Sequence, residues 1–81
     1  MKARVLVFLK STVLDPQGQT VRHALNGLGY REVADVRQGK CFDIVIADGV
    51  TRDQAQKDIE ALAHDVLANP VIEEYTVELT D

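Results

Sequence analysis

The side chains that most often carry out chemistry in proteins are few in this chain and lie far apart in its sequence. Cys41 is the single cysteine, and His23 and His64 are the two histidines. Cys41 would act as a nucleophile if a histidine approached it, but a lone thiol at the start of a strand is more often a packing residue. A zinc site needs three or four ligands, and no cysteine cluster or HxxxH spacing supplies them. We therefore predict no metal site and no nucleophilic centre.

Charged residues form a second group of candidates. Asp58, Glu60 and Asp65 lie on a predicted helix, where acidic side chains usually form a solvated face. Arg37 and Lys40 flank a predicted turn, where two cations can hold an anionic group of a partner or simply keep the turn soluble. The sequence contains no GxSxG, GxxxxGK[ST] or GxGxxG pattern. These observations predict neither catalytic residues nor a cofactor.

The composition argues against several classes of protein. The 81 residues carry a net charge of -4, with two tyrosines, two phenylalanines and no tryptophan. A nucleic-acid binder is typically basic and richer in stacking rings. No stretch approaches the roughly 20 apolar residues of a membrane span. The length favours one domain over residues 1–81. A single cysteine permits no intrachain disulfide, so nothing calls for an oxidising compartment and we expect a location in the cytoplasm. We expect no nucleic-acid or membrane partner.

The apolar pattern predicts the elements that position these residues. Residues 5–9 are apolar on both alternating faces, which is typical of a central strand. Asp15 followed by Pro16 is a helix-start signal, and apolar side chains at helical spacing continue to Leu28. Gly29 is placed to end this helix in a left-handed conformation. The first helix is therefore predicted from Pro16 to Leu28.

Two strands are predicted after this helix, at residues 33–37 and 41–47. Gly39 lies in the short polar link between them and can adopt a positive φ angle, which indicates a hairpin. The second of the two strands is the more apolar, and this composition favours a place in the middle of the sheet.

A second helix and a final strand complete the chain. Thr51 and Gln54 have the spacing of a capping box, and an apolar stripe follows as far as Val66. Asn69 and the proline after it stop the helix. Residues 71–79 then alternate between apolar and polar side chains, which is typical of an edge strand with one wet face.

This element order, βαββαβ, predicts an α+β fold of the ferredoxin-like, split βαβ type. Such a fold has a four-stranded antiparallel sheet with both helices on one face. The other face would expose one apolar set from the central strands, either Leu6 with Phe8 or Val5, Val7 and Leu9. Apolar area of that size is rarely left bare, and a second copy of the chain is the simplest cover.

Three segments in this order resemble a known family. They are LKSTVLDPQG at residues 9–18, VRQGK at residues 36–40 and LANPVIEEY at residues 67–75. Together they resemble PurS, the small subunit of phosphoribosylformylglycinamidine (FGAM) synthase in purine biosynthesis. The resemblance extends over residues 3–79. The chain departs from the family pattern at residues 11–12 and 64–66.

The resemblance implies a subunit that has no catalytic activity of its own and needs no cofactor. The related complexes convert formylglycinamide ribonucleotide, with ATP and glutamine, to the amidine. A synthetase subunit, PurL, carries out the ATP step, and a glutaminase subunit, PurQ, releases ammonia. PurS-like homodimers, or dimers of dimers, hold these two enzymes together so that ammonia passes between them.

The family's motif positions can be carried over residue by residue. At these positions our hypothesis is that Arg37, Lys40 and Lys10 contact a partner subunit and that the other matched residues shape caps and turns. Those other residues are Asp15, Pro16, Gln17, Gly18, Gly39, Asn69, Pro70 and Glu73.

Other functions remain compatible with the predicted element order. A regulatory module of the ACT type shares the order βαββαβ and binds a small effector at a dimer interface, so it predicts a ligand for the isolated chain. An RNA-binding domain of this topology would need an aromatic and basic cluster beside Phe8 and Phe42. Independent enzyme activity would require turnover by the purified chain alone.

Overall fold

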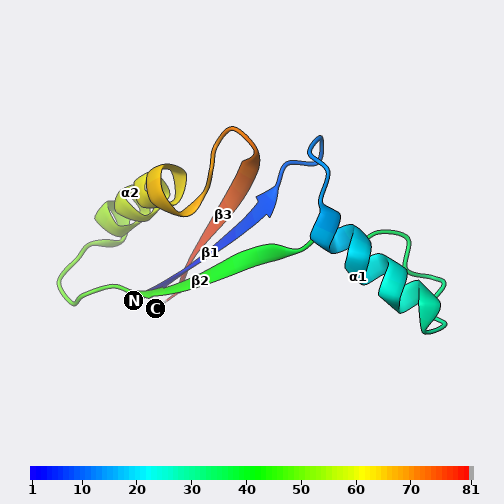
Figure 1. The fold of residues 1–81 in the computed structure, drawn as a ribbon. Helices are drawn as coiled ribbons and strands as arrows, with labels where there is room; N and C mark the ends of the chain where they lie inside the picture. Colours follow the sequence, from blue (N-terminus) through cyan, green and yellow to red (C-terminus); the bar gives the residue numbers. More distant parts are fainter. Residues whose placement is uncertain (81) are drawn as a thin grey trace.

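The structure is a computed structural model that describes residues 1–80. Three strands and three helical segments follow one another along the chain (Figure 1). They are β1 (Lys2–Leu9), α1 (Pro16–Gly27), β2 (Gly39–Val45), α2 (Arg52–Leu62), the π-helix η1 (Ala63–Leu67) and β3 (Glu73–Thr80).

The three strands form one antiparallel sheet with the order β2-β1-β3. Val5 of β1 lies opposite Phe42 of β2 on one side and Val77 of β3 on the other. The prediction that residues 5–9 form a central strand is confirmed, because β1 is paired along both edges.

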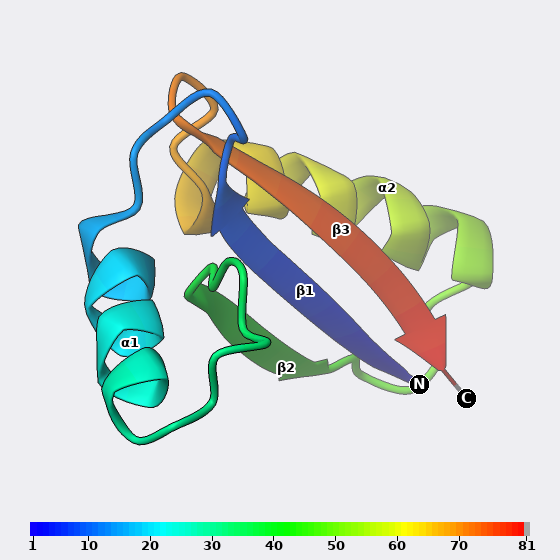
Figure 2. The ribbon, with the colours of Figure 1, turned by 90° about the vertical axis from the view of Figure 1, so that its right-hand side faces the viewer.

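The core lies between one face of this sheet and the two consecutive helical segments α2 and η1. Ala3, Val5 and Val7 are buried on the inner face of β1, and Ile59 and Ala63 are buried opposite them. Figure 2 shows α2 crossing behind β1 and β3. The other face of the sheet carries no helix, and Leu6 and Phe8 lie there half-buried.

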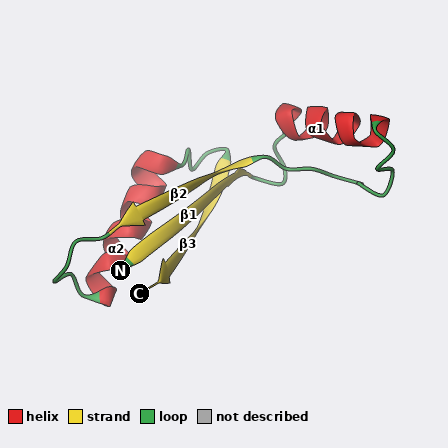
Figure 3. Cartoon of the chain, turned by 90° about the horizontal axis from the view of Figure 1, so that it is seen from below, coloured by secondary structure: helices red, strands yellow, loops and turns green. Residues whose placement is uncertain are grey.

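Helix α1 does not pack on the sheet. It lies beyond the end of the strands, beside the chain that returns to β2 (Figures 1 and 3). We call residues 16–38, which comprise α1 and this returning chain, the α1 arm. The molecule is consequently elongated, at 51 × 26 × 14 Å. Its radius of gyration is 16.1 Å, whereas a compact chain of this length would have a value of about 12 Å.

The predicted four-stranded sheet with both helices on one face is therefore wrong. Residues 33–37 form no strand, and β2, expected in the middle, is an edge strand. The physical reason is that the returning chain bonds with α1 and with its capping residue, Asp15, instead of with β2. The Asn26 side-chain amide donates to the Val33 carbonyl at 3.1 Å, and the Gln38 N–H donates to the Asp15 carboxylate at 2.8 Å.

The predicted helix starts agree with the structure, and α1 ends at Gly27, one residue before the predicted end. Asp15 caps α1 by accepting from the Gly18 N–H at 2.9 Å, and Thr51 caps α2 by accepting from the Gln54 N–H at 3.2 Å. Gly29 adopts a φ of 105° just after α1, where L-residues with a side chain are strained. Within residues 1–80, no helix has the length and apolar character needed to cross a membrane.

Candidate functional site

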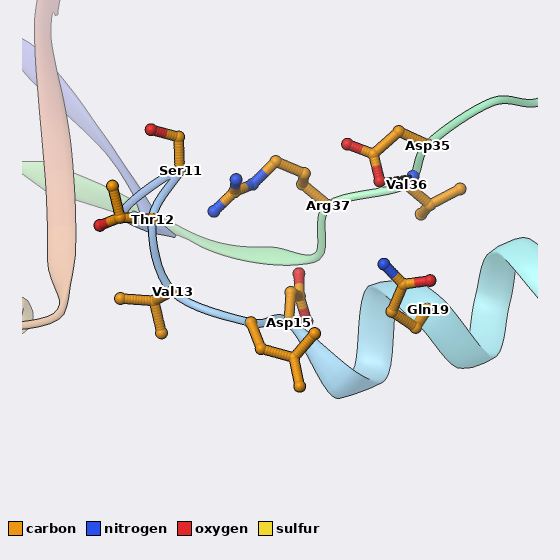
Figure 4. Close-up of a pocket in the computed structure, with 9 residues that line it drawn as sticks. Ser11, Thr12, Val13, Asp15, Gln19, Asp35, Val36 and Arg37 are labelled. Carbon is orange, nitrogen blue, oxygen red and sulfur yellow. Dashed lines mark hydrogen bonds between the residues drawn. The ribbon is translucent and has the colours of Figure 1, made fainter.

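Most of the matched motif residues meet at one place, the hinge between the α1 arm and the sheet. Here the end of β1, the start of α1 and the chain entering β2 come together (Figure 1). A cavity of about 360 Å³ lies at the hinge. It is lined by residues 11–15 on one side and by Gln19, Asp35, Val36 and Arg37 on the other (Figure 4).

The carboxylate of Asp15 joins two segments of the hinge. One oxygen caps α1 through the Gly18 N–H, and the other accepts from the Gln38 N–H, 23 positions along the chain. Both backbone hydrogen bonds lower the pKa of Asp15 below its usual value, and the bond from Gly18 has the larger effect. The side chain is therefore both a helix cap and a cross-link between α1 and the returning chain.

Arg37 makes the reciprocal link from the returning chain to β1. Its Nη2 atom donates to the carbonyl oxygens of Leu9 and Lys10, the latter at 3.0 Å. Figure 4 shows this side chain extending from its own segment toward residues 11 and 12. A guanidinium bonded to two main-chain carbonyls holds its segment in place. The Arg37 side chain, which was predicted to contact a partner, therefore makes hydrogen bonds within its own chain.

Gly18 permits a close approach at the same place. A methyl group added to this residue would overlap the carbonyl oxygen of Val36 and would lie 2.8 Å from the Asp15 carboxylate. The returning backbone can therefore lie against α1 only because residue 18 has no side chain.

Gly39 permits a second close approach, at the start of β2. A methyl group there would lie 2.5 Å from the ring of Phe8 and 2.5 Å from the carbonyl oxygen of Val7. The Phe8 ring thus covers the glycine on the open face of the sheet. The predicted hairpin turn at this glycine is wrong, because Gly39 pairs with Phe8 as the first residue of β2.

Lys40 and Glu73 connect the hinge to the third motif. The Lys40 ammonium lies 3.8 Å from one oxygen of Glu73, whose other oxygen accepts from the Asn69 N–H at 2.7 Å. The carbonyl of Asn69 in turn accepts from the Glu73 N–H at 2.7 Å, so the turn that contains Pro70 is fixed at both ends. The Lys40 side chain is 61% exposed, and an ion pair at this exposure contributes little stability.

The remaining matched residues contribute through their backbone or their position. Lys10 donates its N–H to the Ile72 carbonyl at 2.8 Å, which ties the end of β1 to the same turn. Pro16 occupies the start of α1, where its missing N–H has no cost. Gln17 lines a smaller cavity of about 210 Å³ together with Lys40 and Glu73.

The chemistry-bearing residues named from the sequence are not brought together. Cys41 is exposed on β2, and His23 contacts Arg22 on the arm. His64 bonds with Asp65 at 2.8 Å and meets the ring of Tyr75 edge-on. Among residues 1–80, no three side chains of the histidine, cysteine, aspartate and glutamate types lie close enough together to hold a metal ion.

The hinge thus fixes the direction of the α1 arm. Its carboxylate and its guanidinium both bond to main-chain groups, which suits positioning of a surface rather than conversion of a substrate. The sequence indicated the cap at Asp15 but gave no sign of its second bond or of the Arg37 cross-link. Those contacts join residues more than 20 positions apart, and periodicity carries no information on them.

Comparison with known proteins identifies relatives over nearly the whole chain. The sequence model described as "PurS: Phosphoribosylformylglycinamidine (FGAM) synthase" matches residues 2–81. The phosphoribosylformylglycinamidine synthase subunit PurS of Mycobacterium leprae is 42% identical over 76 residues, which cover 94% of this chain and 91% of the relative.

Solved structures give the same result. The crystal structure of Bacillus subtilis PurS is 41% identical with a TM-score of 0.83, covering 99% of this chain and 98% of that one. A chain from the structure of PurLQS from Thermotoga maritima is 31% identical, also with a TM-score of 0.83, covering 95% of this chain and 93% of that one.

The two close approaches at the hinge predict the effect of adding a methyl group. Gly18→Ala and Gly39→Ala should each lower the free energy of unfolding by roughly 1–3 kcal/mol, because the added carbon overlaps fixed atoms. Gly27→Ala is the matched control, since nothing lies within 4 Å of its added carbon, and it should be neutral or stabilising by up to about 1 kcal/mol. Urea unfolding measures all three, and equal effects would contradict the packing described.

The bonds to Asp15 predict a dependence of stability on pH. Because the pKa of Asp15 is lowered by folding, its carboxylate stabilises the fold fully above the unfolded value of about 3.9 and loses that contribution as pH falls through the folded value. Asp15→Asn keeps an acceptor for Gly18 but not for Gln38. The stability gap between wild type and variant should therefore be largest at neutral pH and shrink in acid.

Urea unfolding of both proteins over a pH series measures this gap. Asp48→Asn, which changes an exposed carboxylate away from the hinge, is the control and should follow the wild type. A gap for Asp15→Asn that stays constant from neutral to acidic pH would show that its carboxylate has no such role.

Proposed function

The chain belongs to the PurS family of FGAM synthase subunits, and we propose that it is the non-catalytic subunit that holds the glutaminase and the synthetase of this complex together. The match over residues 2–81 is the observation that carries this proposal. The likeness to a chain of PurLQS, in which the S component is found with L and Q, supports it further.

A bridging subunit has a clear physical use in such a reaction. Ammonia released into bulk water is quickly protonated and loses the lone pair that attacks the substrate. The glutaminase site and the ATP-dependent site must therefore be joined through an interior that excludes water. A small rigid protein that binds both enzymes aligns them, and linked weak contacts give a stable complex. We propose the cytoplasm as the location of this complex.

The exposed apolar stripe of the α1 arm supports self-association as a homodimer or a dimer of dimers. Leu28 is 76% exposed, and Val21 and Tyr30 are also uncovered. Leu14, just before the arm, is 73% exposed. An isolated helix of 12 residues is marginal in water, and most helices gain stability from packing. Since α1 does not pack on its own sheet, a second copy of the chain is the proposed cover for this stripe.

Among the hinge cations, Lys40 and Lys10 are proposed to contact a partner subunit. Lys40 projects into solvent and has only a loose ion pair with Glu73. Arg37 is proposed to act mainly by directing the arm, because its Nη2 atom already bonds to two carbonyls. Lys40→Ala should therefore weaken assembly without unfolding the chain.

The uncovered stripe predicts the effect of charge on self-association. Val21→Asp with Leu28→Asp should weaken self-association at least tenfold, because two apolar side chains that it would bury become charged. Thr20→Asp with His23→Asp adds two carboxylates to exposed positions of α1 outside the stripe and should leave it intact. Sedimentation equilibrium measures both, and a wild-type monomer would contradict the proposed dimer.

Reconstitution with the synthetase and glutaminase of the same organism tests the bridging role. Omitting this chain should suppress glutamine-dependent synthesis of the amidine and spare synthesis driven by added ammonia, because only the transfer between sites needs the bridge. Equal rates of glutamine-dependent synthesis with and without the chain would exclude the role. Binding of a small effector by the isolated chain would instead favour a regulatory module.

A further inference from the structure

Charge is unevenly divided between the two parts of the chain. Residues 1–45 contain seven basic and four acidic residues, a net charge of +3, whereas residues 46–81 contain two basic and nine acidic residues, a net charge of -7. The second part forms α2, η1 and β3, which lie together at the side of the molecule away from the α1 arm (Figure 1). On α2 and η1, Asp58, Glu60 and Asp65 are all exposed.

An exposed apolar group lies at the end of this acidic region. Val66 is 76% exposed, Val71 is 77% exposed and Ile72 is 40% exposed. They belong to η1 and to the turn between η1 and β3. We call Asp65, Val66, Val71 and Ile72 the η1 surface.

The π-helix accounts for the exposure of Val66. In a continuous α-helix, the stripe that contains Ala55 and Ile59 would include Val66, as the sequence predicted. The chain instead closes a wider turn, in which the Ala68 N–H bonds to the Ala63 carbonyl at 2.9 Å. Leu67 then packs against the core and Val66 remains in solvent. Wide turns of this kind occur frequently at functional positions.

The η1 surface is also held in a fixed shape. The His64 ring meets the Tyr75 ring edge-on, with 6.4 Å between centroids, and so attaches η1 to β3. The Asn69 side chain accepts from the Val71 N–H at 3.1 Å, and the Ile72 N–H donates to the Asn69 carbonyl at 3.1 Å. A preformed surface loses little conformational entropy on binding.

We propose that the η1 surface docks into an apolar groove with a basic rim on one of the two larger subunits of the complex. This inference rests on the proposed function and names the surface that would carry it. Val66 and Val71 would enter the groove, and the acidic side chains of α2 and η1 would pair with the rim and steer the approach.

A second copy of the chain is a poorer occupant of this surface. Two η1 surfaces facing each other would bring acidic residues together and would be mutually repulsive. The α1 arm offers a separate apolar stripe for self-association, so each surface has its own partner. The net charge of -7 over residues 46–81 also disfavours phosphate-bearing partners such as nucleic acids and anionic membranes.

Titration of fluorescently labelled chain with each larger subunit separately, at low and at high salt, tests the proposal. Val66→Ser with Val71→Ser should weaken binding to one of the two subunits at least tenfold. Asp58→Lys with Asp65→Lys should also weaken that binding and should remove its dependence on salt. Glu32→Lys with Asp48→Lys makes the same change in net charge at exposed positions elsewhere and should bind as the wild type does.

Circular dichroism and sedimentation equilibrium of each variant show whether fold and self-association are intact. If both η1 variants bind the two subunits like the wild type, the proposal is wrong while the bridging role stands. If they lose self-association instead, the η1 surface lies between copies of this chain and the proposal is equally wrong. If the wild type binds neither larger subunit, the bridging role itself fails.

Discussion

The arrangement of this chain depends on a pair of cross-links that hold α1 away from its own sheet. Asp15, at the start of α1, bonds to the backbone just before β2, and Arg37, just before β2, bonds to the backbone at the end of β1. Gly18 lets the two segments touch. Both links bond to main-chain groups and thereby fix the direction of the arm. In this direction the apolar stripe of the arm has no cover from the rest of the chain.

An elongated protomer of this kind suits a protein that works between others. The sheet and α2 supply a small buried core. The arm and the η1 surface lie at separate places, in two parts of the chain that differ in net charge. The arm can then bind a second copy of the chain and the η1 surface a larger enzyme, without competition for the same side chains. The match to the PurS family and the likeness to a chain of PurLQS support the proposed place of this chain between other subunits.

Local signals in the sequence predicted the elements well and their assembly poorly. The cap at Asp15, the helix end at Gly29 and the central strand β1 follow from neighbouring residues and are confirmed. The fourth strand at residues 33–37 is absent. A valine-containing stretch can form a strand only if the edge of a sheet pairs with it, and in this structure α1 bonds to that stretch instead.

The same limit explains what sequence patterns missed at the hinge and at the η1 surface. The motif beside Lys40 predicts a partner contact for Arg37, but no neighbouring residue signals its bonds to carbonyls 27 and 28 positions away. An α-helical period places Val66 on the apolar stripe of the second helix, whereas the wider turn of η1 leaves it at the surface. Neither the long-range bond nor the change of helical period leaves a pattern in neighbouring residues.

The position of α1 relative to its own sheet is the most direct test of this account. Spin labels on Cys41 and on a cysteine introduced by Gly27→Cys, with labelled chain diluted into an excess of unlabelled chain, report the distance within one protomer by pulsed electron paramagnetic resonance. An arm held away from the sheet predicts one narrow distribution at a long separation. A short distance, as expected if α1 lay on its own sheet, would contradict it.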